Sequence, residues 1–219
     1  MIVHKYTFLN AAVSAIFAIS SFSAIAHGSH SHTHPQSEKA LQAAKGIFDD
    51  SDVKDRTLTD WQGIWVSVNP LLLNGKLDPV LESKAQKNKD KTVEEYRAYY
   101  KKGYATDVDT IGIENNVIEF TQNGVVNSCQ YAYSGFKILH YASGKKGVRY
   151  LFECQDAKSK APKYIQFSDH IIEPQASGHF HLYMGNGSQE KLLEQLENWP
   201  TYYPYSLTDE QVIHEMLHH

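Results

Sequence analysis

Three histidines in the last quarter of the chain have the types and spacing of a metal site. His179 and His181 are separated by one residue, so on a β-strand, where alternate side chains share a face, they present two imidazoles together. His170 closes the preceding predicted strand, near 163–169, and a short connection can return it beside His179 in an antiparallel pair. The spacing therefore predicts that three imidazoles converge on one point.

Three neutral imidazoles suit a divalent transition-metal ion. At about 2.0 to 2.1 Å they fit tetrahedral Zn²⁺ and leave the fourth position for water or another ligand. Cadmium, copper or nickel can occupy such a site, because nitrogen ligands follow a general affinity order and do not exclude neighbouring metals. A His-x-His pair alone is more often an ordinary surface or core feature, so it is the addition of His170 that favours metal binding.

A second group of histidines lies near the amino terminus. Residues 27–36 contain His27, His30, His32 and His34 and no large apolar side chain, which predicts a flexible arm. The arm can capture metal weakly while its imidazoles are deprotonated, and capture fails as the pH drops well below about 6.5. It is also a candidate source of the fourth ligand. The alternative is a soluble spacer with no role.

The remaining histidines carry less weight. His214-Glu215-Met-Leu-His218 matches the metalloprotease pattern, in which two histidines one helical turn apart hold zinc and the glutamate is the general base. The motif lies in a terminal turn expected to fray, and no third ligand follows at the usual distance, so we do not predict a protease. His140, alone in a predicted strand, is expected to be packed or at the surface.

The start of the chain and its charge balance indicate the compartment and exclude some partners. Residues 1–26 resemble a secretory signal peptide, with Lys5, a short apolar stretch and small residues ending at Ala26. No stretch is apolar for long enough to insert in a membrane, which needs about 20 residues. With 21 Lys+Arg against 25 Asp+Glu, the chain lacks the basic surplus typical of nucleic-acid binding. Export makes a disulfide the default for Cys129 and Cys154, with thiolate metal ligands as the alternative.

Hydrophobic periodicity predicts a mainly β single domain over 37–219 with added helices. Helices are expected over 37–48, within 70–105, over 188–199 and from 208 onward. Turn pairs such as Asn115-Asn116, Ser134-Gly135 and Gly144-Lys145 separate short apolar runs. The expected strands lie near 61–68, 108–113, 117–122, 125–133, 136–142, 147–154, 163–169 and 179–184, which suffice for an up-and-down antiparallel barrel. The aromatic segment 199–205 is expected to plug one end of the core, with a sugar-stacking platform as the alternative.

Several segments of the chain resemble the ZinT (YodA) family of periplasmic metal-binding proteins. The resemblance covers nearly all of the chain after the signal peptide, and its motifs are GIFDD (46–50), DRTLTDW (55–61), GYATD (103–107), SGKKGVRYLFEC (143–154), APKYIQFSDH (161–170) and NWPTYYP (198–204). It implies a lipocalin-like (calycin) barrel with flanking helices, a disulfide, and a zinc or cadmium site whose ligands fall on His170, His179 and His181. Gly63-Ile-Trp65 also resembles the Gly-x-Trp signature of lipocalin first strands.

The resemblance further implies a role in zinc scarcity, with zinc passed to the binding protein of a zinc ABC importer. We therefore expect a periplasmic zinc carrier, monomeric and without enzymatic activity. The first alternative is a zinc-dependent hydratase or hydrolase, because three histidines and an open position also activate zinc-bound water. The second is a carrier of an apolar ligand, which the expectation of inward-pointing histidines and many tyrosines argues against.

Overall fold

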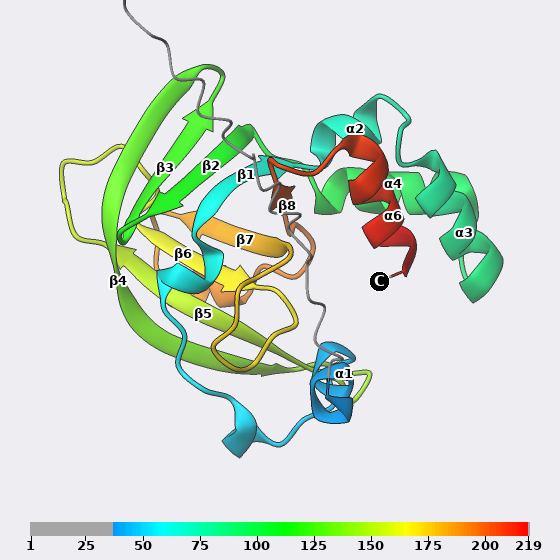
Figure 1. The fold of residues 1–219 in the computed structure, drawn as a ribbon, viewed down its shortest axis with the longest axis horizontal. Helices are drawn as coiled ribbons and strands as arrows, with labels where there is room; N and C mark the ends of the chain where they lie inside the picture. Colours follow the sequence, from blue (N-terminus) through cyan, green and yellow to red (C-terminus); the bar gives the residue numbers. More distant parts are fainter. Residues whose placement is uncertain (1–36, 219) are drawn as a thin grey trace, which may run out of the picture. The chain divides into compact units, whose positions relative to one another are not determined.

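The structure, a computed structural model, describes residues 37–218, and it shows a closed antiparallel barrel of eight strands. Each strand pairs with the next one along the chain, and the last pairs with the first (Figure 1). The strands are β1 (Gly63–Ser67), β2 (Val108–Glu114), β3 (Val117–Gln122), β4 (Val125–His140), β5 (Lys146–Cys154), β6 (Tyr164–Ser168), β7 (Phe180–Gly185) and β8 (Thr201–Pro204). The predicted up-and-down barrel is confirmed. The predicted signal peptide, the histidine arm and His219 lie outside the described residues.

Two strand predictions were wrong, although the predicted number of strands equals the observed number. The two strands expected over 125–133 and 136–142 are one strand, β4, whose pairing with β5 shifts register between Tyr133 and Phe136. Gly135, with φ of 96°, supplies a backbone conformation that suits a bulge, so Ser134-Gly135 bends a strand and does not reverse it. The missing eighth strand is β8, in the segment expected to form an aromatic plug.

The true hairpin turns follow the residue types that favour them. Asn115 and Asn116 join β2 to β3 with φ of 49° and 63°, a left-handed pair that asparagine tolerates better than most residues. Asn123 and Gly124 repeat this between β3 and β4, with φ of 50° and 76°.

Six helices accompany the barrel within the described residues. They are α1 (Glu38–Ala44), α2 (Asn69–Leu73), α3 (Asp78–Asn88), α4 (Val93–Gly103), α5 (Gln189–Leu193) and α6 (Asp209–His218), with short 3-10 turns η1 (Asp50–Asp52) and η2 (Leu58–Trp61). The helical excursion between β1 and β2 is confirmed as α2 to α4. Helix α4 begins with a reciprocal capping box of Thr92 and Glu95. Helix α5, capped by Ser188, is shorter than the predicted 188–199.

The hydrophobic core has two parts. Aromatic rings fill the barrel, where Trp61 stacks on Phe167 at 4.8 Å between centroids and Phe180 stacks on Tyr202 at 5.5 Å. The second cluster lies among the helices and includes Val68, Leu72, Leu77, Val80, Leu81, Tyr96, Tyr104, Tyr203, Val212 and Met216. This ring packing contrasts with the roomy apolar interior that a carrier of an apolar ligand needs, and it argues against the carrier alternative.

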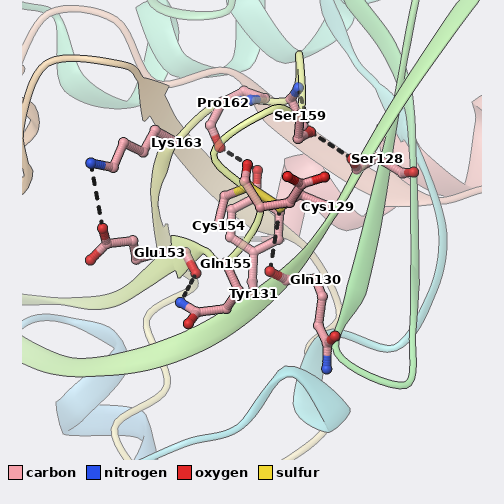
Figure 2. Close-up of a disulfide and its surroundings, with 12 residues drawn as sticks. Ser128, Cys129, Gln130, Tyr131, Glu153, Cys154, Gln155, Ser159, Pro162 and Lys163 are labelled. Atoms are coloured by element: carbon pink, nitrogen blue, oxygen red, sulfur yellow. Dashed lines mark hydrogen bonds and ion pairs between the residues drawn. A yellow bond between two sulfur atoms is a disulfide. The ribbon is translucent and has the colours of Figure 1, made fainter.

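A disulfide joins Cys129 of β4 to Cys154 of β5, with Cα atoms 5.7 Å apart (Figure 2). The default prediction for the two cysteines is therefore correct, and the thiolate-ligand alternative is not. Two hydrogen bonds lie near the disulfide. The Tyr131 hydroxyl donates to the Pro162 carbonyl, and the Ser159 hydroxyl donates to the Ser128 carbonyl. None of the helices among residues 37–218 is both long and apolar enough to cross a membrane.

Candidate metal centre

The structure brings the three predicted histidines together. One ligand atom from each of His170, His179 and His181 lies within 4.8 Å of the others, and within the described chain this is the one group of three or more such residues. The ring centroids are 5.4 to 5.8 Å apart. Only His181 lies in a strand, because β7 begins after His179 and β6 ends two residues before His170.

The histidines lie on the outer face of the barrel wall and not inside it. In β7 the fully buried Phe180 and Leu182 belong to the barrel core, and His181 alternates between them onto the opposite face. The expectation of inward-pointing histidines was therefore wrong. His170 is exposed and the other two are half-buried, so the centre is open to solvent on one side.

The spacing of two ring nitrogens suits a tetrahedral ion. Nε2 of His181 lies 3.3 Å from Nε2 of His170. Bonds of about 2.0 to 2.1 Å at tetrahedral angles place two zinc ligands about 3.3 to 3.4 Å apart. The chemistry of the donor set and this separation both fit zinc, and a ligand atom of His179 lies within 4.8 Å of the other two.

A hydroxyl group fixes the orientation and tautomer of His181. The Thr201 hydroxyl donates its single proton to the Trp199 carbonyl at 3.0 Å. Nδ1 of His181 lies 2.8 Å from the Thr201 hydroxyl oxygen. Because the hydroxyl proton is already used, Nδ1 is the donor in this bond and carries the ring proton. Nε2 is then the nitrogen with the lone pair, as a metal ligand requires.

Thr201 is in turn positioned by the end of helix α4. The Trp199 ring packs so closely on Gly103 that a Cβ there would collide with the indole. The Trp199 amide donates to the Gly103 carbonyl at 2.6 Å. The Asn198 side chain adds bonds to the carbonyls of Lys102, Gly103 and Ala105. The helical excursion thus fixes the segment that enters β8.

His179 is held by its neighbours on two sides. Its ring stacks on Tyr203, with centroids 5.2 Å apart and planes at 15°. Burial and the nearby Glu215 carboxylate raise the pKa of Tyr203, so its phenol stays neutral. The Ser177 hydroxyl donates to the His179 carbonyl at 2.6 Å.

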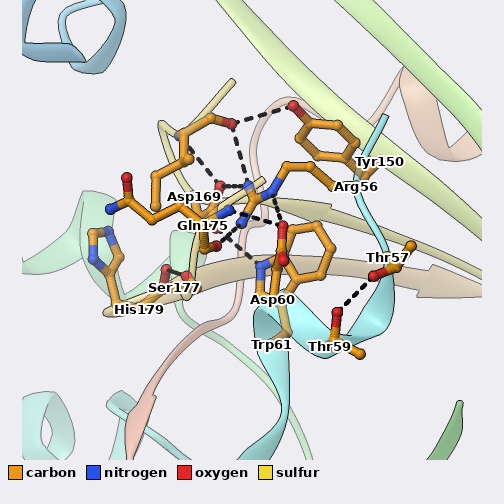
Figure 3. A network of polar contacts seen from close by, with 11 residues as sticks. Arg56, Thr57, Thr59, Asp60, Trp61, Tyr150, Asp169, Gln175, Ser177 and His179 are labelled. Carbon is orange, nitrogen blue, oxygen red and sulfur yellow. Dashed lines mark hydrogen bonds and ion pairs between the residues drawn. The ribbon is translucent and has the colours of Figure 1, made fainter. Parts of the chain in front are cut away.

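A buried ion-pair network organises the loop that carries His170 and His179 (Figure 3). Arg56 donates through Nη1 to Asp169 at 2.6 Å and through Nε to Asp60 at 2.7 Å. Its remaining bonds reach the loop carbonyls of Ile171 and Gln175. The guanidinium therefore ties Asp60 of η2 to the start and the middle of the β6–β7 connection.

The other partners of the two carboxylates complete this network. Asp169 also accepts from the Trp61 indole at 3.0 Å, and Asp60 accepts from the Gln175 amide at 3.2 Å. Burial alone would lower the pKa of Arg56, but the bonds to Asp169 and Asp60 outweigh it and keep the pKa above its usual value. The charged guanidinium, bonded to Asp169 and to the Ile171 carbonyl, fixes the loop backbone on either side of His170.

His170 itself has an unusual backbone conformation, with φ of 65°. A left-handed conformation costs a residue other than glycine roughly 1 kcal/mol or more, and it persists where the surroundings impose it. The Ile171 amide bonds the neighbouring Asp169 carboxylate at 3.2 Å, so the same network accounts for this turn.

The other predicted histidines do not join this centre. His27, His30, His32 and His34 lie outside the described residues. His140 is exposed, with Nε2 3.8 Å from Asp50. His214 and His218 are exposed on α6, which is packed through Val212 and Met216 and is not the frayed turn that the sequence suggested.

Sequence reasoning missed the residues that position the ligands. Arg56 and Asp60 lie in a segment that was used only as a family motif, and Trp61 was also assigned to the first predicted strand. Asp169 and Thr201 received no role. The buried Arg56 and Asp169 are 113 residues apart in sequence, so no local spacing announces them. One local pattern could have indicated an ion pair near the core. Arg56 and Asp60 have opposite charges and are four residues apart, and Trp61 follows directly.

The comparisons with known proteins agree on one family of metal-binding proteins. The model of the family described as ZinT (YodA) periplasmic lipocalin-like zinc-recruitment matches residues 39–219. Probable metal-binding protein YrpE of Bacillus subtilis (strain 168) is 46% identical over 182 residues, covering 83% of this chain and 72% of the relative. Zinc-binding lipoprotein AdcA of Streptococcus pneumoniae (strain ATCC BAA-255 / R6) is 47% identical over 184 residues. The chain spans only 37% of the length of AdcA.

A solved structure agrees with the fold. The chain is similar to the crystal structure of the Zn(II)-bound ZinT-like domain of Streptococcus pneumoniae AdcA, with 48% identity and a TM-score of 0.78. That likeness covers 80% of this chain and 97% of the domain. The barrel, its outer histidine trio and these matches lead to one conclusion, that the chain belongs to the ZinT (YodA) family.

Proposed function

We propose that this chain is a periplasmic zinc-binding protein that holds Zn²⁺ at His170, His179 and His181, captures it under scarcity and passes it to the zinc-binding component of an ABC importer. The observation that carries the binding site is the trio of ligand atoms within 4.8 Å of one another. Water or a further side chain takes the fourth position. Cd²⁺ binds the same nitrogens as a substitute.

The zinc-bound state of a relative supports zinc as the ion. The AdcA domain that this chain resembles was crystallised with Zn(II), and the family description names zinc recruitment. In this chain, the Thr201 bond holds His181 in the tautomer that zinc needs, and Tyr203 and the Arg56 network restrict the other two rings. Such preorganisation strengthens binding because less freedom is lost when the ion arrives.

We also propose that the four arm histidines collect zinc for this centre. The arm joins the chain immediately before Ser37, which caps α1. Ala43 of α1 and His170 line the same small hollow, so this helix lies against the loop of the centre. The arm, attached one short helix away in the sequence, is therefore our candidate for delivering an ion or supplying the fourth ligand.

Metal analysis after extensive dialysis tests the site. The full chain should retain about one zinc, His179→Ala should lose it, and a variant with all four arm histidines changed to Asn should keep it. His140→Ala is the matched control, because it removes an exposed histidine that does not belong to the trio. If His179→Ala keeps its tightest zinc, the assignment is wrong.

Delivery is tested with a zinc-loaded chain and an apo importer-binding protein. Direct transfer requires a rate that rises with the concentration of the acceptor and exceeds the rate of zinc loss to a dilute chelator. Equal rates would show release into solvent and would contradict the delivery step. Light scattering of the zinc-loaded chain tests the accompanying proposal that it is a monomer.

We propose binding, and not catalysis, as the activity. The opposing hypothesis is a zinc hydratase or hydrolase, which needs an acceptor placed beside zinc-bound water. Ester hydrolysis and CO₂ hydration are measured on the zinc-loaded chain. Turnover that disappears in His179→Ala would establish the enzyme instead.

A further inference from the structure

The last helix carries a second pair of histidines that the zinc centre does not use. His214 and His218 are one turn apart on α6, and both are exposed. Side chains four residues apart on a helix are neighbours on one face. The helix is anchored by the buried Val212 and Met216, and the Lys87 ammonium donates to the Leu217 carbonyl at 3.3 Å. The pair therefore sits on an ordered surface.

The two rings already lie side by side. Their centroids are 4.3 Å apart and their planes differ by 37°. Nδ1 of His218 is 2.8 Å from the His214 carbonyl oxygen, which can only accept, so Nδ1 carries the proton. The lone pair of His218 is then on Nε2, at the outer end of the ring. A ring whose Nδ1–H bonds a carbonyl is the usual state of a metal-bound histidine.

The surroundings also favour a cation. His218 lies in the last turn of α6, where the carbonyl groups give the helix end a partial negative charge, and His214 lies one turn before it. Glu215, three residues before His218, is also exposed and carries a carboxyl group. The positively charged Lys87 directs its ammonium group to the Leu217 carbonyl.

We propose that His214 and His218 form a second metal site, which binds one Zn²⁺, Ni²⁺ or Cu²⁺ ion through both imidazoles, with water in the other positions. The site is weaker than the trio because it supplies two protein ligands in place of three. It is exposed on a helix surface, so it loads from solvent without any rearrangement of the barrel.

The test uses the full chain with zinc already held at the barrel, so that the second site is studied in the folded protein. The four arm histidines are changed to Asn, and His219 is changed to Asn, to remove other exposed imidazoles. One equivalent of Ni²⁺ is titrated while the histidine ring signals are followed by NMR. We expect the signals of His214 and His218 to broaden together and calorimetry to show one added ion.

Single variants decide whether the pair acts as a unit. In His214→Gln the affinity for Ni²⁺ should fall at least about tenfold, and the His218 signal should lose its response at the same metal concentration. His218→Gln should weaken Ni²⁺ binding to the same extent and remove the response of the His214 signal. His140→Gln should change neither the affinity nor the signals. Circular dichroism and amide exchange of α6 confirm that the helix is retained in each variant.

The proposal is overturned if either single variant binds Ni²⁺ as tightly as the parent, or if the two rings respond at different metal concentrations. Barrel zinc is counted in every sample, so a failure of the second site is distinguished from a failure of the first.

Discussion

His181 and His170 reach the same point by different structural means. His181 belongs to β7, where the pairs with β6 and β8 fix its backbone and a single hydroxyl fixes its ring. His170 lies beyond the end of β6 in a left-handed conformation. Its loop is held by a buried ion pair between the neighbouring Asp169 and Arg56, which is 113 residues away in the sequence.

The comparison shows how much more a loop ligand needs than a strand ligand. A strand already sets the direction of its side chains, so one well-placed partner completes the orientation. A loop has no repeating pattern of backbone bonds. Its orientation therefore depends on Arg56, which bonds Asp169, Asp60 and two loop carbonyls. The loop ligands should therefore be the ones most affected by distant mutations.

Removing the loop anchor is expected to have the largest effect. Arg56→Met leaves the carboxylate of Asp169, which is fully buried, without its cationic partner. We expect a loss of about 3 to 5 kcal/mol in the free energy of unfolding, because an unpaired buried charge remains. Urea denaturation of the apo protein measures this, and zinc affinity should fall with it as the loop loosens.

Arg97→Met is the matched control. Arg97 pairs with Asp78 at 2.7 Å, but both side chains are about 40% exposed. A pair in that position contributes about 1 kcal/mol or less. Equal losses in the two arginine variants would contradict the role assigned to burial in the network.

Removing the disulfide separates stability from the metal centre. Cys129→Ala with Cys154→Ala opens a link between residues 25 apart and should cost about 3 to 4 kcal/mol by the chain-entropy model. The pairing of β5 with β6 places Cys154 at the opposite end of these strands from His170, roughly 20 Å away. Zinc affinity should stay unchanged in the folded double variant, as competition with a chromophoric chelator would show.

Thr201→Val tests the strand ligand. Valine keeps the shape but removes the hydroxyl that accepts from Nδ1 of His181. We expect zinc affinity to fall roughly 10- to 100-fold, the range typical for loss of a bond behind a metal ligand. Thr201→Ser should restore it. The ¹⁵N shifts of the His181 ring in the apo protein provide a second readout, because the Nδ1–H form should dominate only when the hydroxyl is present.

The smallest effect concerns the backbone of His170. His170→Asn and His170→Ala both remove the imidazole and should bind zinc equally poorly. Asparagine tolerates a left-handed conformation better than alanine, so the Asn variant should be more stable by up to about 1 kcal/mol. Thermal unfolding of the two apo variants measures the difference. An alanine variant as stable as the asparagine variant would show that the turn carries no strain.

The sequence was sufficient for the barrel and for the histidine trio because both follow from short-range patterns. Alternation places His179 and His181 on one face, and the short connection returns His170 to them. The same alternation does not say which face is inside, and the expectation of inward-pointing rings failed on that point. The buried neighbours Phe180 and Leu182 decide it.

The anchors could not be predicted because their partners are distant in sequence. Nothing near Asp169 indicates that Arg56 will bury its charge there, and Thr201 lay in a segment interpreted as an aromatic plug. The bulge at Ser134 and Gly135 was mistaken for a turn because glycine favours both conformations. Each of these outcomes is decided by tertiary packing.

The close packing of Trp199 on Gly103 limits how the domain could be simplified by design. The insertion of α2, α3 and α4 between the first two strands looks like an appendage that could be trimmed. Its last residue, Gly103, however, packs against the indole of Trp199, two residues before the Thr201 that orients His181. A minimal barrel without the insertion would keep all three candidate ligands and lose the scaffold that aims one of them, so any graft of this centre onto another barrel must bring the end of α4 along.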